Sequence, residues 1–114
     1  FLKDGTISGN LKKILTEHRF VLKRHPFGLP EAMLEQDGIL RTVAASDTLA
    51  VGGIHKNVKK ILQGKRVLPF LRPIWPLVAD SGNRPLALAN CCADFQISVS
   101  DGILPVHPDF PILF

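Results

Sequence analysis

The sequence lacks any apolar run long enough to cross a membrane. A helix that spans a bilayer needs roughly 18–20 consecutive apolar residues, and no apolar stretch in these 114 residues approaches that length. The first ten residues also lack a signal peptide, because Asp4 and the pair Ser8 and Gly9 interrupt them. Both absences favour a cytoplasmic protein without a membrane partner. The chain begins with Phe1 rather than Met, so we expect it to be part of a longer protein.

Cysteine is scarce, and the two cysteines are neighbours, Cys91 and Cys92. Adjacent cysteines form a strained ring when they pair, and two thiols cannot build the disulfide framework of a small secreted protein. A metal site needs further ligands nearby, and the surrounding sequence supplies none. We therefore interpret both residues as small buried apolar side chains in a strand.

Recognisable catalytic motifs are missing as well. Residues 5–9 (Gly-Thr-Ile-Ser-Gly) have neither the spacing nor the Gly-Lys-Ser/Thr end of a phosphate-binding loop. No Gly-x-Ser-x-Gly elbow occurs, and the four histidines show no His-Glu-x-x-His pattern. Glu31 and Glu35 have the spacing of one helix face, but a solvated surface explains them equally well. The chain alone is thus not expected to be an enzyme or to hold a cofactor or metal.

Positive charge is concentrated in two parts of the chain. The first basic segment, residues 1–24, has six basic and two acidic residues, and the second basic segment, residues 54–72, has six basic residues and no acid. The intervening residues 25–53 and the final residues 73–114 are each net acidic. The two basic segments are therefore the candidates for contact with a polyanion.

The two basic segments also resemble each other in sequence. Residues 10–15 (Asn-Leu-Lys-Lys-Ile-Leu) recur 47 positions later as residues 57–62 (Asn-Val-Lys-Lys-Ile-Leu). Such a spacing suggests a duplicated supersecondary unit, with half-repeats over residues 9–50 and 54–99. A coincidental pair of Lys-Lys helices is the alternative.

Each basic segment predicts a short amphipathic helix. The asparagine at the start of each motif suits the N-cap, where its side-chain oxygen accepts from a free backbone N–H. Apolar residues at i, i+3 and i+4 form one buried stripe, so the lysine pairs between them should face solvent. We expect Gly64 to end the second helix in the left-handed conformation.

The rest of the sequence predicts strands and turns. Asp37 and Gly38 form a turn signal before the first strand, and residues 80–83 (Asp-Ser-Gly-Asn) form the turn of a hairpin. The tail contains three prolines and should pack as an extended edge. We therefore predict one α+β domain over residues 1–114, with short amphipathic helices packed on antiparallel strands in a sandwich-like arrangement. The expected strands are residues 38–44, 48–51, 76–79, 85–89 and 95–99.

The second basic segment and the strands after it resemble a known family. Residues 58–63 (Val-Lys-Lys-Ile-Leu-Gln), 66–72 (Arg-Val-Leu-Pro-Phe-Leu-Arg) and 75–78 (Trp-Pro-Leu-Val) follow, in order, the pattern of the C-terminal domain of bacterial tRNA(Ile)-lysidine synthetases. That pattern consists of a Leu-Lys-Lys helix, a Val-Pro-Pro-Trp-Leu-Arg-like turn, a Pro-Leu strand, a turn and a second short strand. The chain departs from it with Leu-Pro-Phe in place of Pro-Pro-Trp, and with Pro73 in place of an acidic residue. Residues 1–50 match only loosely.

The resemblance implies an origin in an ATP-dependent ligase that attaches lysine to the wobble cytidine of an isoleucine tRNA. Catalysis in that family belongs to an N-terminal domain with a Ser-Gly-Gly-x-Asp-Ser loop, which is absent here. ATP and magnesium are therefore expected for the catalytic domain and not for this chain. The family's C-terminal domain helps to recognise the tRNA on its acceptor-stem side, and its fold is similar to part of the β subunit of phenylalanyl-tRNA synthetase. The implied partners are the tRNA and the catalytic domain of the same protein.

Two functions remain open at this point. tRNA binding requires basic residues that meet phosphates on one shared face and an affinity that falls with salt. A docking module for another domain or protein requires an exposed apolar patch and is indifferent to salt. Trp75 and Phe70 are more typical of core anchors than of stacking platforms for an unpaired base. The residues that we expect to contact RNA are Lys56, Lys59, Lys60, Lys65, Arg66 and Arg72 in the second basic segment, with Lys12 and Lys13 in the first.

Overall fold

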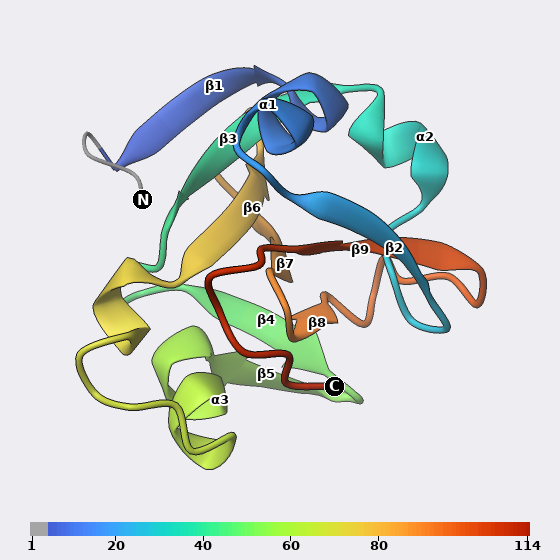
Figure 1. The fold of residues 1–114 in the computed structure, drawn as a ribbon. Coiled ribbons are helices and arrows are strands. Elements are labelled where there is room, and N and C mark those ends of the chain that lie inside the picture. The colour runs from blue at the N-terminus through green and yellow to red at the C-terminus, as the bar shows by residue number, and fades with distance from the viewer. Residues whose placement is uncertain (1–4) are drawn as a thin grey trace.

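A five-stranded antiparallel sheet forms the centre of the fold (Figure 1). The computed structural model describes residues 5–114. The strand order in this sheet is β1-β3-β6-β7-β8. Its strands are β1 (Thr6–Asn10), β3 (Asp37–Thr42), β6 (Pro76–Asp80), β7 (Pro85–Leu88) and β8 (Cys92–Ala93).

Two two-stranded sheets and three short helices complete the described part of the chain. Strand β2 (Val21–His25) pairs with β9 (Gly102–Val106), and β4 (Thr48–Val51) pairs with β5 (Ile54–Asn57). The helices are α1 (Leu11–Glu17), α2 (Glu31–Leu34) and α3 (Val58–Gly64), with a 3-10 turn η1 (Arg72–Ile74). Strands hold 39% of the described residues and helices 19%, which confirms the α+β class with strands as the larger share. No helix within residues 5–114 combines the length and the apolar character needed to span a membrane.

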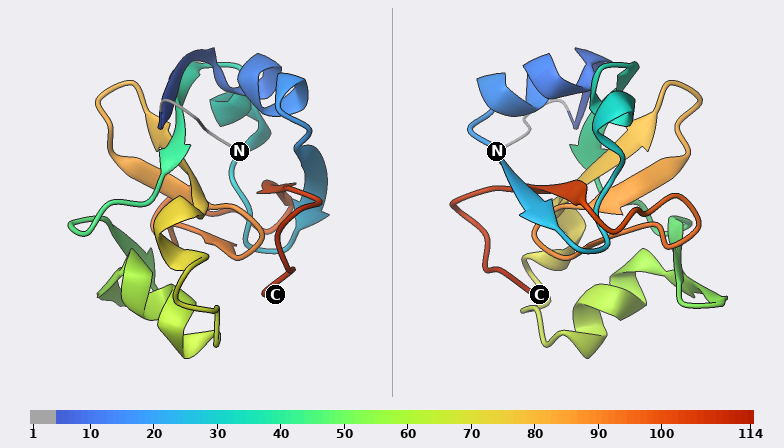
Figure 2. Two further views of the ribbon diagram at one scale, coloured as in Figure 1. Left: turned by 60° about the vertical axis from the view of Figure 1, so that its left-hand side comes forward. Right: turned by 90° about the vertical axis from the view of Figure 1, so that its right-hand side faces the viewer.

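The central sheet separates two hydrophobic cores. Successive residues of a strand point to opposite faces. In β6, Val78 accordingly joins one core, while Leu77 and Ala79 join the other. The stripe of α1 packs into the first core and that of α3 into the second. The two amphipathic helices therefore cover opposite faces of one sheet, and Figure 2 shows them at opposite ends of the molecule in both views.

The two helices begin in the same way. The Asn10 side chain accepts a hydrogen bond from the Lys13 N–H at 3.1 Å, and the Asn57 side chain accepts from the Lys60 N–H at 3.3 Å. Both N-caps predicted from the sequence are thus confirmed. Each cap also connects its helix to a distant segment. The Asn10 side-chain amide donates to the Glu35 carbonyl oxygen at 2.9 Å, and the Asn57 side-chain amide donates to the Ala45 carbonyl oxygen at 2.8 Å.

The two helices also end in the same way, and not as predicted for Gly64. The left-handed residue after α3 is Arg66, with φ 61°, and its counterpart after α1 is Arg19, with φ 71°. In α3 the next residue, Val67, is buried, and its N–H donates to the Leu62 carbonyl oxygen at 3.0 Å. Burial of that apolar side chain turns the backbone at Arg66, so Gly64 stays helical and the prediction for it is wrong.

Substitution of Gly64 by alanine is therefore expected to stabilise the protein by about 0.5–1 kcal/mol, because an alanine reduces the freedom of the unfolded chain at a helical position. An added Cβ would meet nothing within 4 Å. Gly52→Ala is the matched control: it also has open space, but φ is +64°, so the variant should be destabilised by about 1 kcal/mol. Urea unfolding of both variants measures the difference in their stability. Equal effects on stability would contradict the helical conformation of Gly64.

Four of the five predicted strands are confirmed within two residues, and the fifth is wrong. Residues 95–99 form a turn that Asp94 closes: its side chain accepts from the Gln96 N–H at 2.9 Å, and its carbonyl oxygen accepts from the Ser98 N–H at 3.0 Å. The second side-chain oxygen accepts from the Ala50 N–H at 3.1 Å. A buried aspartate that satisfies backbone donors in this way overrides the alternating pattern of the residues that follow.

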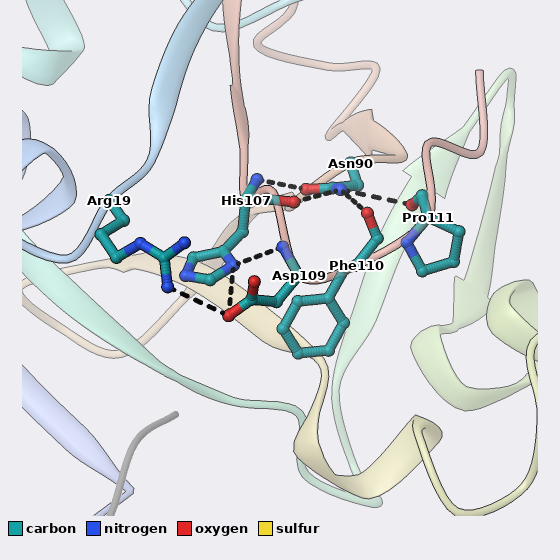
Figure 3. Close-up of polar contacts among 6 residues, drawn as sticks. All are labelled: Arg19, Asn90, His107, Asp109, Phe110 and Pro111. Atoms are coloured by element: carbon teal, nitrogen blue, oxygen red, sulfur yellow. Dashed lines mark hydrogen bonds and ion pairs between the residues drawn. The ribbon is translucent and has the colours of Figure 1, made fainter.

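The first part of the proline-rich tail is extended in β9, as predicted, whereas residues 108–110 form a turn; Asn90 holds this last segment in place (Figure 3). This fully buried side chain donates to the carbonyl oxygens of His107 at 3.0 Å and Phe110 at 2.9 Å, and it accepts from the His107 N–H at 2.7 Å. The Asn90 backbone carbonyl accepts from the Leu113 N–H at 2.7 Å. One residue thus fixes the last segment of the chain against the sheet.

Candidate nucleic-acid interface

The two predicted groups of RNA-binding residues lie far apart. Lys12 and Lys13 lie on α1, whereas the other six surround α3 and the loop after it. Figures 1 and 2 place α1 and α3 at opposite ends in every view. The tRNA hypothesis required the two groups to share one face, and they do not. The reason is the packing of the two apolar stripes on opposite faces of the sheet, which sends the lysines in opposite directions.

The first basic segment is largely balanced by acidic neighbours. Lys12 lies 3.6 Å from Glu35, and Arg19 lies 3.3 Å from Asp109. Arg24 pairs at 3.6 Å with Glu31 and at 3.9 Å with Asp101. Such exposed pairs add little stability, but they reduce the positive potential around α1. Lys3 belongs to this segment and lies outside the described residues.

The second basic segment lines an open groove of about 740 Å³. Lys56 comes from β5, Lys60 from α3 and Lys65 from the end of α3, and His55 adds a further basic group. We call this site the basic groove. Its walls contain no acidic residue, and none of these three lysines forms an ion pair among residues 5–114. The lining residues are Val51, His55, Lys56, Asn57, Lys60, Ile61, Gly64, Lys65, Cys91, Cys92, Leu113 and Phe114.

The remaining three predicted residues do not line the basic groove. Lys59 is half-buried, so the prediction that both lysines of this pair face solvent is wrong for it. Arg72 is also half-buried, and its Nε donates to the Val67 carbonyl oxygen at 2.9 Å. Arg66 is exposed on the surface beyond α3. The structure therefore brings three of the eight predicted residues into one site.

The lining of the basic groove also contains apolar residues and both cysteines. The Cys92 thiol hydrogen-bonds to Cys91 and lowers the pKa of Cys91; burial opposes this effect, and the charge of Lys65 adds to it. The same hydrogen bond, followed by burial, raises the pKa of Cys92. Both thiols are free; Cys91 is buried and Cys92 half-buried in β8. These residues, with Leu113 and Phe114, reach the groove only through tertiary packing, so no sequence pattern could assign them to it.

The two candidate aromatic residues have opposite environments. Trp75 is fully buried, and its indole N–H donates to the Ala89 carbonyl oxygen at 2.8 Å, which confirms it as a core anchor. Phe70 is 67% exposed, so the same prediction is wrong for that residue. It lies on the loop after α3 with two further exposed apolar residues, Leu68 and Ile74. We call these three residues the loop patch.

Within residues 5–114, no three His, Cys, Asp or Glu side chains gather closely enough to hold a metal ion. Residues 6–9 of the Gly-Thr-Ile-Ser-Gly stretch lie in β1 and not in a phosphate-binding loop.

Comparison with known proteins confirms the resemblance found in the sequence. The chain is 89% identical, over all 114 residues, to tRNA(Ile)-lysidine synthases of two Neisseria meningitidis strains, one of serogroup B and one of serogroup A. It spans 27% of the length of these curated relatives and matches their C-terminal part. No family model and no solved structure matches the chain.

Proposed function

We propose that this chain, which is similar over its whole length to the C-terminal part of tRNA(Ile)-lysidine synthases, is a non-catalytic tRNA-binding domain. It helps to position an isoleucine tRNA, held on the acceptor-stem side, for ATP-dependent attachment of lysine to the wobble cytidine. The observation that carries the proposal is the basic groove, in which three lysines without acidic partners converge from β5 and α3.

The proposed contact is electrostatic. Lysines that neutralise phosphates release the counterions condensed on the RNA, so affinity depends steeply on salt. Such contacts fix the position of the RNA and do not read its sequence. An A-form stem also hides its base edges in a deep, narrow major groove. Selectivity for one tRNA would therefore come from shape and from unpaired nucleotides.

In this proposal, the ligase chemistry belongs to another part of the same protein and not to this chain. The proposal places ATP, magnesium and the ligase reaction in a catalytic domain of the same protein, which is also the proposed protein partner of this domain. A role in tRNA modification agrees with the cytoplasmic location expected from the sequence.

Replacement of two groove lysines tests the proposal. The variant Lys60→Ala/Lys65→Ala should bind isoleucine tRNA more weakly, and the log–log dependence of affinity on salt should become shallower by about 2 units, one for each lost phosphate contact. The measurement is a fluorescence titration of labelled tRNA, repeated over a series of salt concentrations, with a second tRNA to test selectivity.

The repeat within the chain offers a matched control. Lys12→Ala/Lys13→Ala removes the same charge from the corresponding helix at the opposite end, where Glu35 already balances Lys12. This variant should keep most of the affinity and the salt slope. Equal losses in both variants would mean that only net charge matters, and tRNA binding that ignores both salt and the groove lysines would refute the proposal.

The loop patch favours a second candidate function, docking to another domain. Its three apolar side chains are 46–67% exposed, and the matched relatives are several times longer than this chain. In this alternative the loop patch packs against the catalytic domain and the lysines have no RNA contact. A Phe70→Ser substitution would then weaken association with that domain at every salt concentration, while the Lys60→Ala/Lys65→Ala variant would bind it normally.

A further inference from the structure

We infer that the basic groove takes an unpaired RNA strand next to a stem, and not the stem itself. This inference rests on the proposed function and specifies which part of the RNA enters the site. It follows from three properties of the groove: its size, the chemistry of its two sides, and the way in which both sides are held.

The size of the basic groove fits a single strand better than a helical stem. Its volume of about 740 Å³ lies within the range of sites that enclose one small ligand. A paired stem stacks its bases inside and is far wider than such a site. A strand with splayed nucleotides can place a phosphate and a base in the groove together.

The chemistry of the two sides suits a single strand. Proteins that bind single strands combine a positive track for the backbone with apolar or aromatic surfaces for the bases. Lys56, Lys60 and Lys65 supply the positive side, and Leu113 and Phe114 belong to the apolar side. A site for phosphates alone would need no apolar side.

Phe114 is the aromatic surface of the groove. The residue is 53% exposed, and its ring packs edge to face on His25, with ring centres 4.9 Å apart and planes at 80°. The contact with His25 orients the ring and leaves part of it open to a base. Base stacking on such a ring tolerates any sequence, because every base has a π face.

Both sides of the groove are held by contacts within the fold. On the tail side, the Leu113 N–H donates to the Asn90 carbonyl oxygen at 2.7 Å, which fixes the residue next to Phe114. On the helix side, the Val58 N–H donates to the Asp47 backbone carbonyl oxygen at 2.9 Å. The Asn57 side-chain amide donates to the Ala45 carbonyl oxygen at 2.8 Å. A site that is already formed loses less entropy when a flexible strand enters.

Two matched RNAs test the inference: a blunt-ended hairpin whose strands are joined by a flexible non-nucleotide linker in place of a loop, and the same hairpin with a short unpaired extension at its 3′ or 5′ end. The 114-residue chain should bind an extended hairpin about tenfold more tightly than the blunt one, as expected for one stacked base. A gain with either extension supports the inference, and the end that gives it defines the polarity of the strand.

Phe114→Ala should remove the gain, so that this variant binds the extended and the blunt hairpin with equal affinity. Phe114→Trp should retain the gain, and its added fluorescence should be quenched by the extended hairpin alone. Phe70→Ala is the control, because it removes another exposed aromatic ring that does not line the groove. Thermal melting of each variant checks that the fold is intact.

The outcomes separate this inference from the proposed function. Salt-dependent binding of both hairpins with no gain from an extension would overturn the inference and leave the proposed function in place. If no hairpin and no tRNA binds, both fail. A gain that survives Phe114→Ala would also overturn the placement of the strand in the groove.

Discussion

Replacement of Arg41 by methionine is expected to lower the free energy of unfolding by about 3–5 kcal/mol, the cost of leaving one charge of a buried ion pair without its partner. The Arg41 guanidinium donates to both carboxylate oxygens of Asp47, at 2.7 and 2.8 Å, and its Nε donates to Asn83 at 2.7 Å. Both members of the pair are less than 10% exposed. The methionine keeps the apolar stem of the side chain and removes only the charge. Urea unfolding at neutral pH measures the loss.

A second variant separates the charge from the packing. In Arg41→Met/Asp47→Asn the uncompensated carboxylate is gone, and the asparagine oxygen can still accept from the Ala44 N–H, as Asp47 does at 2.7 Å. The double variant should therefore recover part of the stability, and the double-mutant cycle gives the coupling energy. A loss below about 1 kcal/mol in Arg41→Met would contradict the importance of the pair.

The ion pair also makes the stability of the wild-type protein depend on pH, and Arg41→Met should lose this dependence. Burial by itself raises the pKa of Asp47, but the hydrogen bonds from Arg41 and from the Ala44 N–H, together with the Arg41 charge, outweigh it, so the pKa lies below its ordinary value. A lowered pKa in the folded state contributes stability above the unfolded pKa, near 4, that is lost as the pH falls through the folded value. Wild-type stability should fall in this acidic range, and that of Arg41→Met should fall less.

This ion pair matters for the basic groove because it fixes the loop that receives α3. The Asp47 carbonyl oxygen accepts from the Val58 N–H, and the Ala45 carbonyl oxygen accepts from the N-cap Asn57. We therefore expect Arg41→Met to loosen the start of α3 and to weaken RNA binding without removing any groove residue. Faster amide hydrogen exchange at Val58 would report that effect directly.

Local features of the fold could be predicted from the sequence. Both N-caps, both apolar stripes and the hairpin around residues 80–83 are confirmed, because each depends on residues within one or two turns of chain. The left-handed residue after each helix was missed. At Arg66 and Arg19 a buried apolar neighbour determines the turn, and no local preference of arginine reveals it.

The candidate site could be predicted only in part. The absence of acid in residues 54–72 identifies the basic side of the groove, since charge is visible in the sequence. The apolar side comes from Cys91 and Cys92 at the start of β8, and from Leu113 and Phe114, whose tail is held by Asn90. Likewise, equal lysine pairs on two similar helices gave no sign that the helices cover opposite faces of the sheet.

Replacement of Asn90 by alanine should be the second strongly destabilising change, with a loss of about 3 kcal/mol or more. The side chain donates to the carbonyl oxygens of His107, Phe110 and, at 3.3 Å, Pro111, and accepts from the His107 N–H (Figure 3). Alanine would remove all four of these side-chain hydrogen bonds to the backbone of the tail. Position 90 also has φ 61°, a left-handed conformation that asparagine tolerates better than alanine.

Asn90→Gly separates these two costs. Glycine accepts the left-handed conformation freely, so it removes the hydrogen bonds and keeps the backbone unstrained. Its loss relative to wild type measures the side-chain contacts to the tail, and the further loss in Asn90→Ala, about 1–2 kcal/mol, measures the strain. In both variants, amide hydrogen exchange should rise first at His107, whose N–H bonds to the Asn90 side chain, and then at Leu113. If Asn90→Gly unfolds at the wild-type urea concentration with unchanged exchange at His107, the tail is held by its apolar packing, and the fixed position of Phe114 in the groove loses its main support.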